Sequence, residues 1–228
     1  MSCMSMAHSK TRLRYAKAAP ARVAHTLSEV FAPTSGDASC VGFVLAQLGR
    51  SAAPLLWVQD RLSIMETGQP YGPGTAPARP ILRVAVSRPV DVLWAMEEGL
   101  RCAGLAGVIG EIWGDPPALS FTATKRLALH AESSGVSCWL IRRGAEANLS
   151  AARNRWRVDA LPSTRHPFDQ QAPGEPRWRA ELFRSRYARP GVWTAQYDCA
   201  AHCLDMSAHV RDRAMAEGPD AGRQSATG

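Results

Sequence analysis

The chain has 228 residues, of which 46% are hydrophobic and 21% charged, and its formal net charge is +7. This length and composition predict one globular domain with a sizeable core. No apolar run approaches the ~18 residues that a membrane helix needs, and the basic N-terminal stretch lacks the apolar segment of a signal peptide, so we expect a cytoplasmic protein.

The expected elements alternate along the chain between strands and helices. Residues 1–22 are basic, polar and small and are expected to form a flexible arm. The predicted core, residues 23–143, has strands at 27–31, 54–58, 81–86, 105–112 and 136–141, helices at 40–48, 89–103 and 118–134, and loops at 32–39 and 68–80. This alternation predicts an α/β fold with a mostly parallel sheet and helices on both faces.

Two details of the helices follow from their residue patterns. In the helix at 89–103, the spacing of apolar residues predicts a buried face, while Glu98 and Arg101 should face water. That buried face is expected to contain Val90, Leu93, Trp94 and Leu100. Gly135 is expected to end the helix at 118–134, because glycine readily adopts the left-handed conformation that follows many helices.

After Arg143 the helical periodicity fades and prolines separate short segments. Residues 144–198 are predicted to form a small arginine-rich antiparallel extension at one edge of the sheet, with strands near 156–161, 178–186 and 191–197. In a strand, Arg155 and Arg157 share one face and Trp156 the other, so we expect the tryptophan in the core and the arginines on the surface. Residues 199–228 are expected to form a partly disordered tail.

Basic charge is concentrated in this extension. The span 142–190 contains 11 arginines and five acidic residues, a difference of +6. Arginine binds phosphate and carboxylate through two parallel hydrogen bonds, which favours DNA or an acidic protein as partner, although a GC-rich genome also enriches arginine. The candidate DNA-contacting or partner-contacting residues are Arg142, Arg143, Arg153, Arg155, Arg157, Arg177, Arg179, Arg184 and Arg186.

The loop after the first strand lies where a nucleotide-binding protein has its phosphate loop. In one alignment to the pattern G-x-x-x-x-G-K-[ST], Gly36 matches, but Asp37 stands at the lysine and Ala38 at the hydroxyl residue. In the other alignment Ser39 alone matches, and Ala32, Asp37 and Ala38 do not. Neither supplies a lysine, and the Asp37 carboxylate would repel phosphates, so we expect a degenerate loop without a cofactor.

Other candidate sites are weak. Glu111 near the end of a predicted strand could help to hold Mg²⁺ in a working ATPase, but without the lysine we interpret it as a solvated or capping acid. Six cysteines, at positions 3, 40, 102, 138, 199 and 203, lie mostly in apolar segments and are expected to be reduced, buried thiols of a cytosolic protein. Cys199, His202 and Cys203 lack the fourth ligand of a zinc site, so we expect no metal. No G-x-S-x-G motif supports a hydrolase, and we expect no catalytic residue.

Several segments, taken in this order, resemble the ImuA family, whose members are related to RecA and SulA. The resemblance covers roughly residues 25–198. It is carried by Glu29-Val30-Phe31, Leu55-Leu56-Trp57-Val58, Gly68-Gln69-Pro70-Tyr71-Gly72-Pro73-Gly74, Asp91-Val92-Leu93-Trp94-Ala95-Met96-Glu97-Glu98-Gly99-Leu100-Arg101, Ser150-Ala151-Ala152-Arg153-Asn154-Arg155-Trp156-Arg157-Val158 and Pro173-Gly174-Glu175-Pro176-Arg177-Trp178.

The resemblance implies a RecA-like core and a non-catalytic, nucleoid-associated accessory role in SOS-induced, error-prone translesion DNA synthesis. It implies partners, namely an ImuB-like Y-family polymerase adaptor and an error-prone replicative-type DNA polymerase, with RecA and DNA as further candidates. Two alternatives remain open: a SulA-like inhibitor of a division or recombination protein, and a residual P-loop-type ATPase that uses Lys125 or an arginine as its cation.

Overall fold

The structure is a computed structural model, and it describes residues 25–32, 34, 36–71 and 79–208. The expected N-terminal arm, most of the turn at 71–74 and the end of the expected C-terminal tail lie outside the described residues. None of the described helices is long and apolar enough to cross a membrane.

Nine strands form one sheet in the order β3-β2-β4-β5-β1-β6-β7-β8-β9. The strands from β3 to β6 in this order run parallel, and β7, β8 and β9 continue the sheet in antiparallel fashion. The strands are β1 (Leu27–Phe31), β2 (Leu55–Asp60), β3 (Ile81–Val86), β4 (Gly107–Trp113), β5 (Ser137–Arg143), β6 (Asn154–Leu161), β7 (Arg177–Ser185), β8 (Gly191–Asp198) and β9 (Cys203–Ala208). The predicted α/β fold, with a mostly parallel sheet and an antiparallel C-terminal extension, is confirmed.

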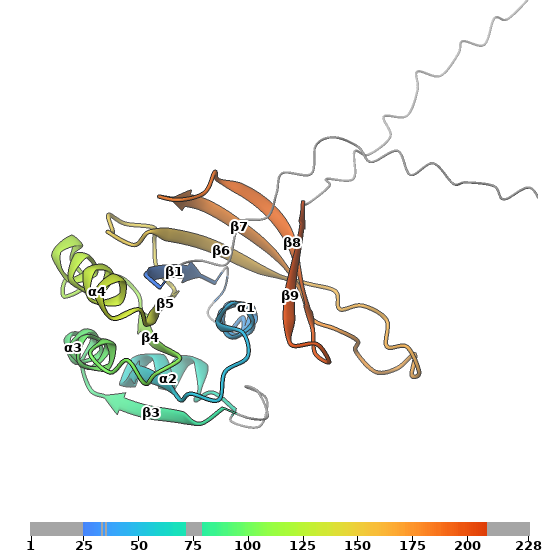
Figure 1. The fold of residues 1–228 in the computed structure, drawn as a ribbon, viewed down its shortest axis with the longest axis horizontal. Coiled ribbons are helices and arrows are strands. Elements are labelled where there is room, and N and C mark those ends of the chain that lie inside the picture. Colours follow the sequence, from blue (N-terminus) through green and yellow to red (C-terminus); the bar gives the residue numbers. More distant parts are fainter. Residues whose placement is uncertain (1–24, 33, 35, 72–78, 209–228) are drawn as a thin grey trace, which may run out of the picture.

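The described residues form four helices beside the sheet, and Figure 1 shows α1 on one face and α3 and α4 on the other. Their bounds are α1 (Ser39–Leu48), α2 (Arg61–Thr67), α3 (Pro89–Leu100) and α4 (Phe121–Ser134). Each face has its own core, because a sheet covered on both sides buries alternate residues in opposite directions. Met96 and Leu127 belong to the core under α3 and α4.

The core under α1 is aromatic and is built largely by the C-terminal strands. Phe43 of α1 packs against Trp156 with ring centroids 5.2 Å apart and against Trp178 with centroids 6.4 Å apart. Trp156 also packs against Trp193. The helix approaches closely at Gly42, where an added Cβ would lie 2.7 Å from the ring of Trp178. The prediction that Trp156 belongs to the core is confirmed, since its side chain is fully buried.

The predicted buried face of α3 is wrong at two of its four residues. Val90 is 45% exposed and Trp94 is 65% exposed, whereas Met96 and Val92 are completely buried. A helix with apolar residues on two adjacent stripes has no unique inward face by periodicity alone, and here the stripe through Val92, Leu93, Met96 and Leu100 faces the sheet.

Two elements are absent from the sequence predictions. The short helix α2 follows β2 directly and begins at Arg61. Asp60 is its N-cap, and the Asp60 carboxylate accepts a hydrogen bond from the backbone N–H of Ser63 at 2.7 Å. The strand β9 pairs with β8 within the expected tail. Gly135 ends α4 with φ 70°, as predicted, but α4 begins at Phe121 after Ser120, whose hydroxyl caps the helix.

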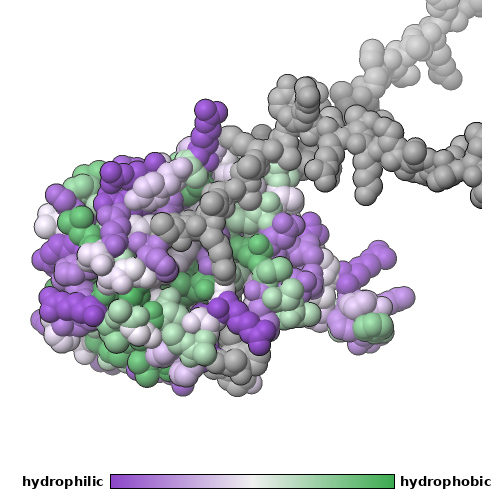
Figure 2. Space-filling view, viewed as in Figure 1, coloured by the Kyte–Doolittle hydropathy of each residue, from purple (hydrophilic) through white to green (hydrophobic). Residues whose placement is uncertain are grey.

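The connection between β6 and β7, residues 162–176, extends beyond the strands. It is the loop at the lower right of Figure 1, and it forms the separate projection on the right of the space-filling view in Figure 2. The projection therefore lies away from both cores.

Candidate functional site

The degenerate loop lies at the carboxyl ends of the parallel strands, as predicted for a phosphate loop, but the side chains of Asp37 and Ser39 bond to the protein itself. The Asp37 carboxylate accepts a hydrogen bond from the backbone N–H of Ser39 at 2.7 Å. The Ser39 hydroxyl donates to the carbonyl of Val158 in β6 at 3.0 Å. The Asp37 carboxylate thus already accepts from an N–H group at the start of α1 that would otherwise be available to a phosphate. The Ser39 hydroxyl points towards the sheet.

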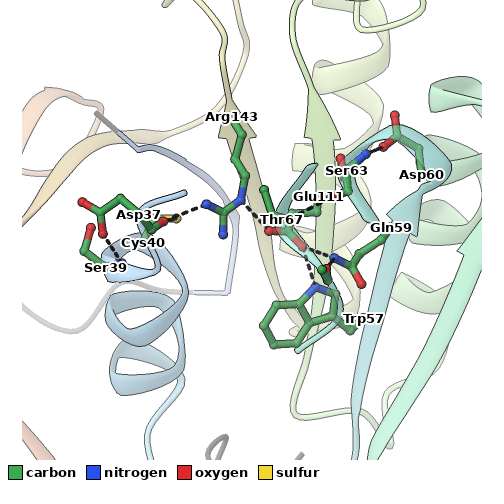
Figure 3. A network of polar contacts seen from close by, with 11 residues as sticks. Asp37, Ser39, Cys40, Trp57, Gln59, Asp60, Ser63, Thr67, Glu111 and Arg143 are labelled. Carbon is green, nitrogen blue, oxygen red and sulfur yellow. Dashed lines mark hydrogen bonds and ion pairs between the residues drawn. The ribbon is translucent and has the colours of Figure 1, made fainter. Parts of the chain in front are cut away.

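Arg143, at the end of β5, fills the space between this loop and the neighbouring strands (Figure 3). Its Nε donates to Glu111 Oε1 at 2.9 Å, and its Nη1 donates to the carbonyl oxygen of Asp37 at 2.7 Å. Only 5% of the Arg143 side chain and 2% of the Glu111 side chain are exposed. An internal cation is therefore paired with an internal acid beside the degenerate loop.

Glu111 is a buried acid with several donors, which corrects its interpretation as a solvated or capping group. Besides Arg143, Gln59 Nε2 donates to Glu111 Oε2 at 2.5 Å and Trp57 Nε1 donates to the same oxygen at 3.4 Å. Strand β4 continues to Trp113, so Glu111 lies within the sheet between β2 and β5 rather than at a strand end. The donors neutralise its charge and satisfy its oxygens, which is how a buried carboxylate is tolerated.

Cys40 lies near this network, and its thiol is buried, as is that of Cys138. Cys102, Cys199 and Cys203 are exposed, so the prediction of buried thiols is wrong for these three. Burial raises the pKa of the Cys40 thiol to about 12, although the positive charge of Arg143 lowers it in part. A thiolate is the nucleophilic form, so the thiol stays neutral at physiological pH. The network offers an ion pair and neutral donors in place of an activated nucleophile.

A second buried polar cluster lies on the other face of the sheet. Arg155 Nε donates to Glu29 Oε2 at 2.7 Å, and the Ser150 hydroxyl donates to Glu29 Oε1 at 2.7 Å. Arg142 Nη2 contacts Asp115 Oδ1 at 2.5 Å. Glu29 and Arg142 line a small polar pocket of about 210 Å³ under residues 148–150.

The arginines of this cluster also stack on aromatic rings. The Arg142 and Arg155 guanidinium carbons lie 5.6 and 5.3 Å from the centroid of Phe31. The Arg157 guanidinium carbon lies 4.2 Å from the centroid of Phe183. Burial lowers the pKa of Arg142, while nearby acids raise it. The ring faces and carboxylates together stabilise positive charge that would be costly in an apolar interior.

The structure divides the nine candidate arginines by exposure. Arg142, Arg143 and Arg155 are buried in ion pairs, so the prediction that Arg155 lies on the surface is wrong. The alternation of faces holds, but Arg155 pairs in register with Glu29 of β1, inside the sheet, and that carboxylate draws the guanidinium inward. Arg157, Arg184 and Arg186 are exposed.

The remaining candidates are partly buried, and most of them are paired with acids. Arg153 forms two hydrogen bonds with Glu132, at 2.6 and 3.1 Å. Arg179 lies 2.9 Å from Asp159 and 3.8 Å from Glu181. Arg177 is half-buried, and its Nε has no hydrogen-bond partner among the described residues. The surface that carries these candidate arginines thus has mixed charge, because cross-strand pairing places acids beside the arginines.

The sequence interpretation missed Glu29, Gln59 and Asp115 as members of buried networks. Glu29 carries a signal in retrospect, since it is the one charged residue of the apolar strand β1. Its arginine partner depends on the pairing of β1 with β6, which residue pattern does not specify. Among the described residues, no group of three or more His, Cys, Asp or Glu side chains is arranged to hold a metal ion.

No family model matches the chain. Two curated proteins, both named Protein ImuA and both from Caulobacter vibrioides (strains NA1000 / CB15N and ATCC 19089 / CIP 103742 / CB 15), are each 32% identical to it over 163 residues. The match covers 67% of this chain and 64% of the length of each relative, which is slightly less than two thirds. This similarity supports the membership of the chain in the ImuA family.

Proposed function

We propose that this protein is a non-catalytic accessory of SOS-induced, error-prone translesion DNA synthesis. In this role it supports the assembly of a mutasome with an ImuB-like Y-family adaptor and an error-prone replicative-type DNA polymerase. The similarity to ImuA proteins supports the proposal. So does the α/β sheet, whose strand–loop–helix start is that expected of a RecA-like core.

The observation that carries the non-catalytic part is the ion pair of Arg143 with Glu111 beside the degenerate loop. In a nucleotide site, loop N–H groups and a lysine face the phosphates. Here the carbonyl of Asp37 accepts from Arg143 and the carboxylate of Asp37 accepts from Ser39. An incoming triphosphate would meet a carboxylate and would have to displace a buried ion pair, which is unfavourable.

A nucleotide titration tests the non-catalytic part. We expect no change in the melting temperature of the full chain with ATP and Mg²⁺, because a ligand that binds only the folded state must raise it. The matched control is Asp37→Ala, which removes the repelling carboxylate. A saturable stabilisation of the unchanged chain by ATP would overturn the non-catalytic proposal and favour the residual ATPase.

A capture experiment tests the accessory role. The tagged full chain is recovered from DNA-damaged cells of the source organism, and its partners are identified by mass spectrometry. We expect the Y-family-like adaptor and the error-prone polymerase. Recovery of a division or recombination protein in their place would favour the SulA-like inhibitor. In parallel, deletion of the gene should lower damage-induced mutation frequency, and the full chain should restore it.

A further inference from the structure

The most exposed large apolar side chain among the described residues is Phe168, which is 94% exposed. It lies within the projection formed by residues 162–176, near the middle of the connection between β6 and β7. The hydropathy view shows a hydrophobic surface among hydrophilic groups on this projection, on the right of Figure 2. Phe168 is therefore not a core residue that has been displaced into solvent, because the projection lies away from both cores.

The projection is ordered by specific hydrogen bonds. Thr164 exchanges backbone hydrogen bonds with Glu175 and Gly174, each at 3.0 Å, and the Thr164 hydroxyl accepts from the N–H of Glu175 at 2.8 Å. Arg165 and Pro173 form an isolated antiparallel bridge. Gly174 fits this arrangement because an added Cβ would lie 2.5 Å from the carbonyl oxygen of Thr164.

The turn that carries Phe168 is held by His166. The backbone N–H groups of Phe168 and Asp169 both donate to His166 Nδ1, at 3.3 and 3.0 Å. The imidazole also contacts the phenyl ring, with centroids 6.2 Å apart and planes at 70°. Four prolines, at 162, 167, 173 and 176, further restrict the segment. The backbone that carries the aromatic ring is thus restricted before binding, which lowers the entropic cost of ordering it in a complex.

The charge of the projection distinguishes between kinds of partner. Residues 162–176 contain one basic residue, Arg165, and two acidic residues, Asp169 and Glu175, so the projection has a net charge of −1 with His166 neutral. This segment is acidic within a chain of net charge +7. A protein surface that stacks nucleic-acid bases is normally basic, because each base is accompanied by a negatively charged backbone phosphate. The acidic balance therefore favours a protein partner.

We infer that Phe168, held by the turn of His166, is an anchor that inserts into an apolar pocket of a partner protein whose rim offers hydrogen-bond donors or positive charge. This inference rests on the proposed accessory function, and it assigns the interface with the Y-family-like adaptor to the projection. Aromatic anchors in such pockets typically dominate the binding free energy of an interface.

The test measures binding of the purified full chain to the purified adaptor of the source organism and, separately, to single-stranded DNA. Phe168→Ala should weaken adaptor binding about thirtyfold or more, the loss typical of an anchor residue, with no change in melting temperature. Phe168→Leu should retain most of the affinity. Tyr187→Ala, which removes another exposed aromatic outside the projection, is the matched control and should bind normally.

A second pair of variants tests the positioning role of His166. The amide oxygen of asparagine can accept hydrogen bonds at nearly the position of Nδ1, so His166→Asn should bind the adaptor normally. His166→Ala removes the acceptor and should weaken binding several-fold while Phe168 is still present. Equal binding by both variants would overturn the positioning role.

The outcomes separate this inference from the proposed function. If the unchanged chain binds the adaptor and Phe168→Ala binds equally well, the anchor is overturned and the accessory function stands. If Phe168→Ala weakens binding to single-stranded DNA and leaves the adaptor unaffected, base stacking replaces the protein pocket. If the unchanged chain does not bind the adaptor at all, the proposed function and the anchor fail together.

Discussion

At the scale of single residues, the indole of Trp156 is the centre of the aromatic core under α1. It is fully buried, and it packs against Phe43 and Trp193. Trp156→Ala should therefore lower the free energy of unfolding by roughly 3–5 kcal/mol, the usual cost of removing a large buried aromatic. Denaturant unfolding measures this loss. Arg184→Ala, at an exposed position, should change it by less than ~0.5 kcal/mol, and a comparable loss there would contradict the assignment of core and surface.

Removing one charge of the buried Arg143–Glu111 pair should cost more stability than removing both charges. Arg143→Met leaves Glu111 buried without its cation, which should lower the free energy of unfolding by roughly 3–5 kcal/mol at neutral pH. Adding Glu111→Gln removes the stranded charge and should restore part of the stability. Urea unfolding of the two variants measures the difference, and a double variant less stable than Arg143→Met would show that the pair is not the source of the effect.

At the scale of elements, α4 is tied to the start of β6 through Glu132 and Arg153. The hydrogen bonds from Arg153 hold the pKa of Glu132 below its ordinary value of 4.5. Because the pKa of Glu132 is lower in the folded state than in the unfolded state, the pair stabilises the fold at pH values above the unfolded-state pKa of Glu132. That stability is lost as the pH falls through the lower, folded-state pKa.

Arg153→Ala should therefore destabilise the protein near neutral pH, and the difference from the unchanged protein should shrink as the pH falls below about 4. Thermal unfolding across this range measures the trend, and carboxyl NMR should show the pKa of Glu132 rising in the variant. Arg157→Ala, whose nearest acid lies 3.9 Å away, serves as the control with a flatter profile. A difference that grows on acidification would contradict the assigned direction of the pKa.

Most elements could be predicted from the sequence because their signals are local. The strand at Leu27–Phe31 and the end of α4 at Gly135 agree with the sequence prediction to the residue. The short helix α2 was missed because its seven residues, about two turns, are too few for a periodic pattern. Strand β9 was missed because it is short and only alternate residues, Leu204, Met206 and Ala208, are partly buried. Its pairing with β8 is a property of the fold that the residue pattern does not specify.

The candidate site could be predicted less well, since burial of charge depends on register. The missing lysine and the misplaced Asp37 could be recognised from the loop sequence alone. That Arg143 fills the site, and that Arg155 points to Glu29, depends on which strands are neighbours in space. An arginine next to a tryptophan in a strand predicts an exposed charge only when no acid faces it from the adjacent strand.

At the scale of the whole molecule, three of the nine candidate arginines, Arg157, Arg184 and Arg186, are exposed to solvent in a chain of net charge +7. If DNA is contacted directly, the combined variant Arg157→Glu, Arg184→Glu and Arg186→Glu should bind single-stranded DNA more weakly. The slope of log affinity against log salt should fall by about 0.7 for each phosphate contact that is lost. Fluorescence anisotropy at several salt concentrations measures this slope. Lys125→Glu, on the exposed side of α4, is the control, and an equal effect there would indicate a general charge effect.

The central position of β1 has a consequence for how the chain is made. Ser28 in this early strand pairs with Asn154, which is 126 residues further along the chain. During synthesis, β1 and α1 leave the ribosome long before either neighbouring strand and before the tryptophans that cover α1. Contacts so distant in sequence form slowly and leave apolar surface open to aggregation in the meantime. A chain truncated after Arg143 would lack the strands that cover β1 and α1, and its apolar surface would stay exposed. The binding residues of this protein are therefore best identified by point substitution in the full-length chain.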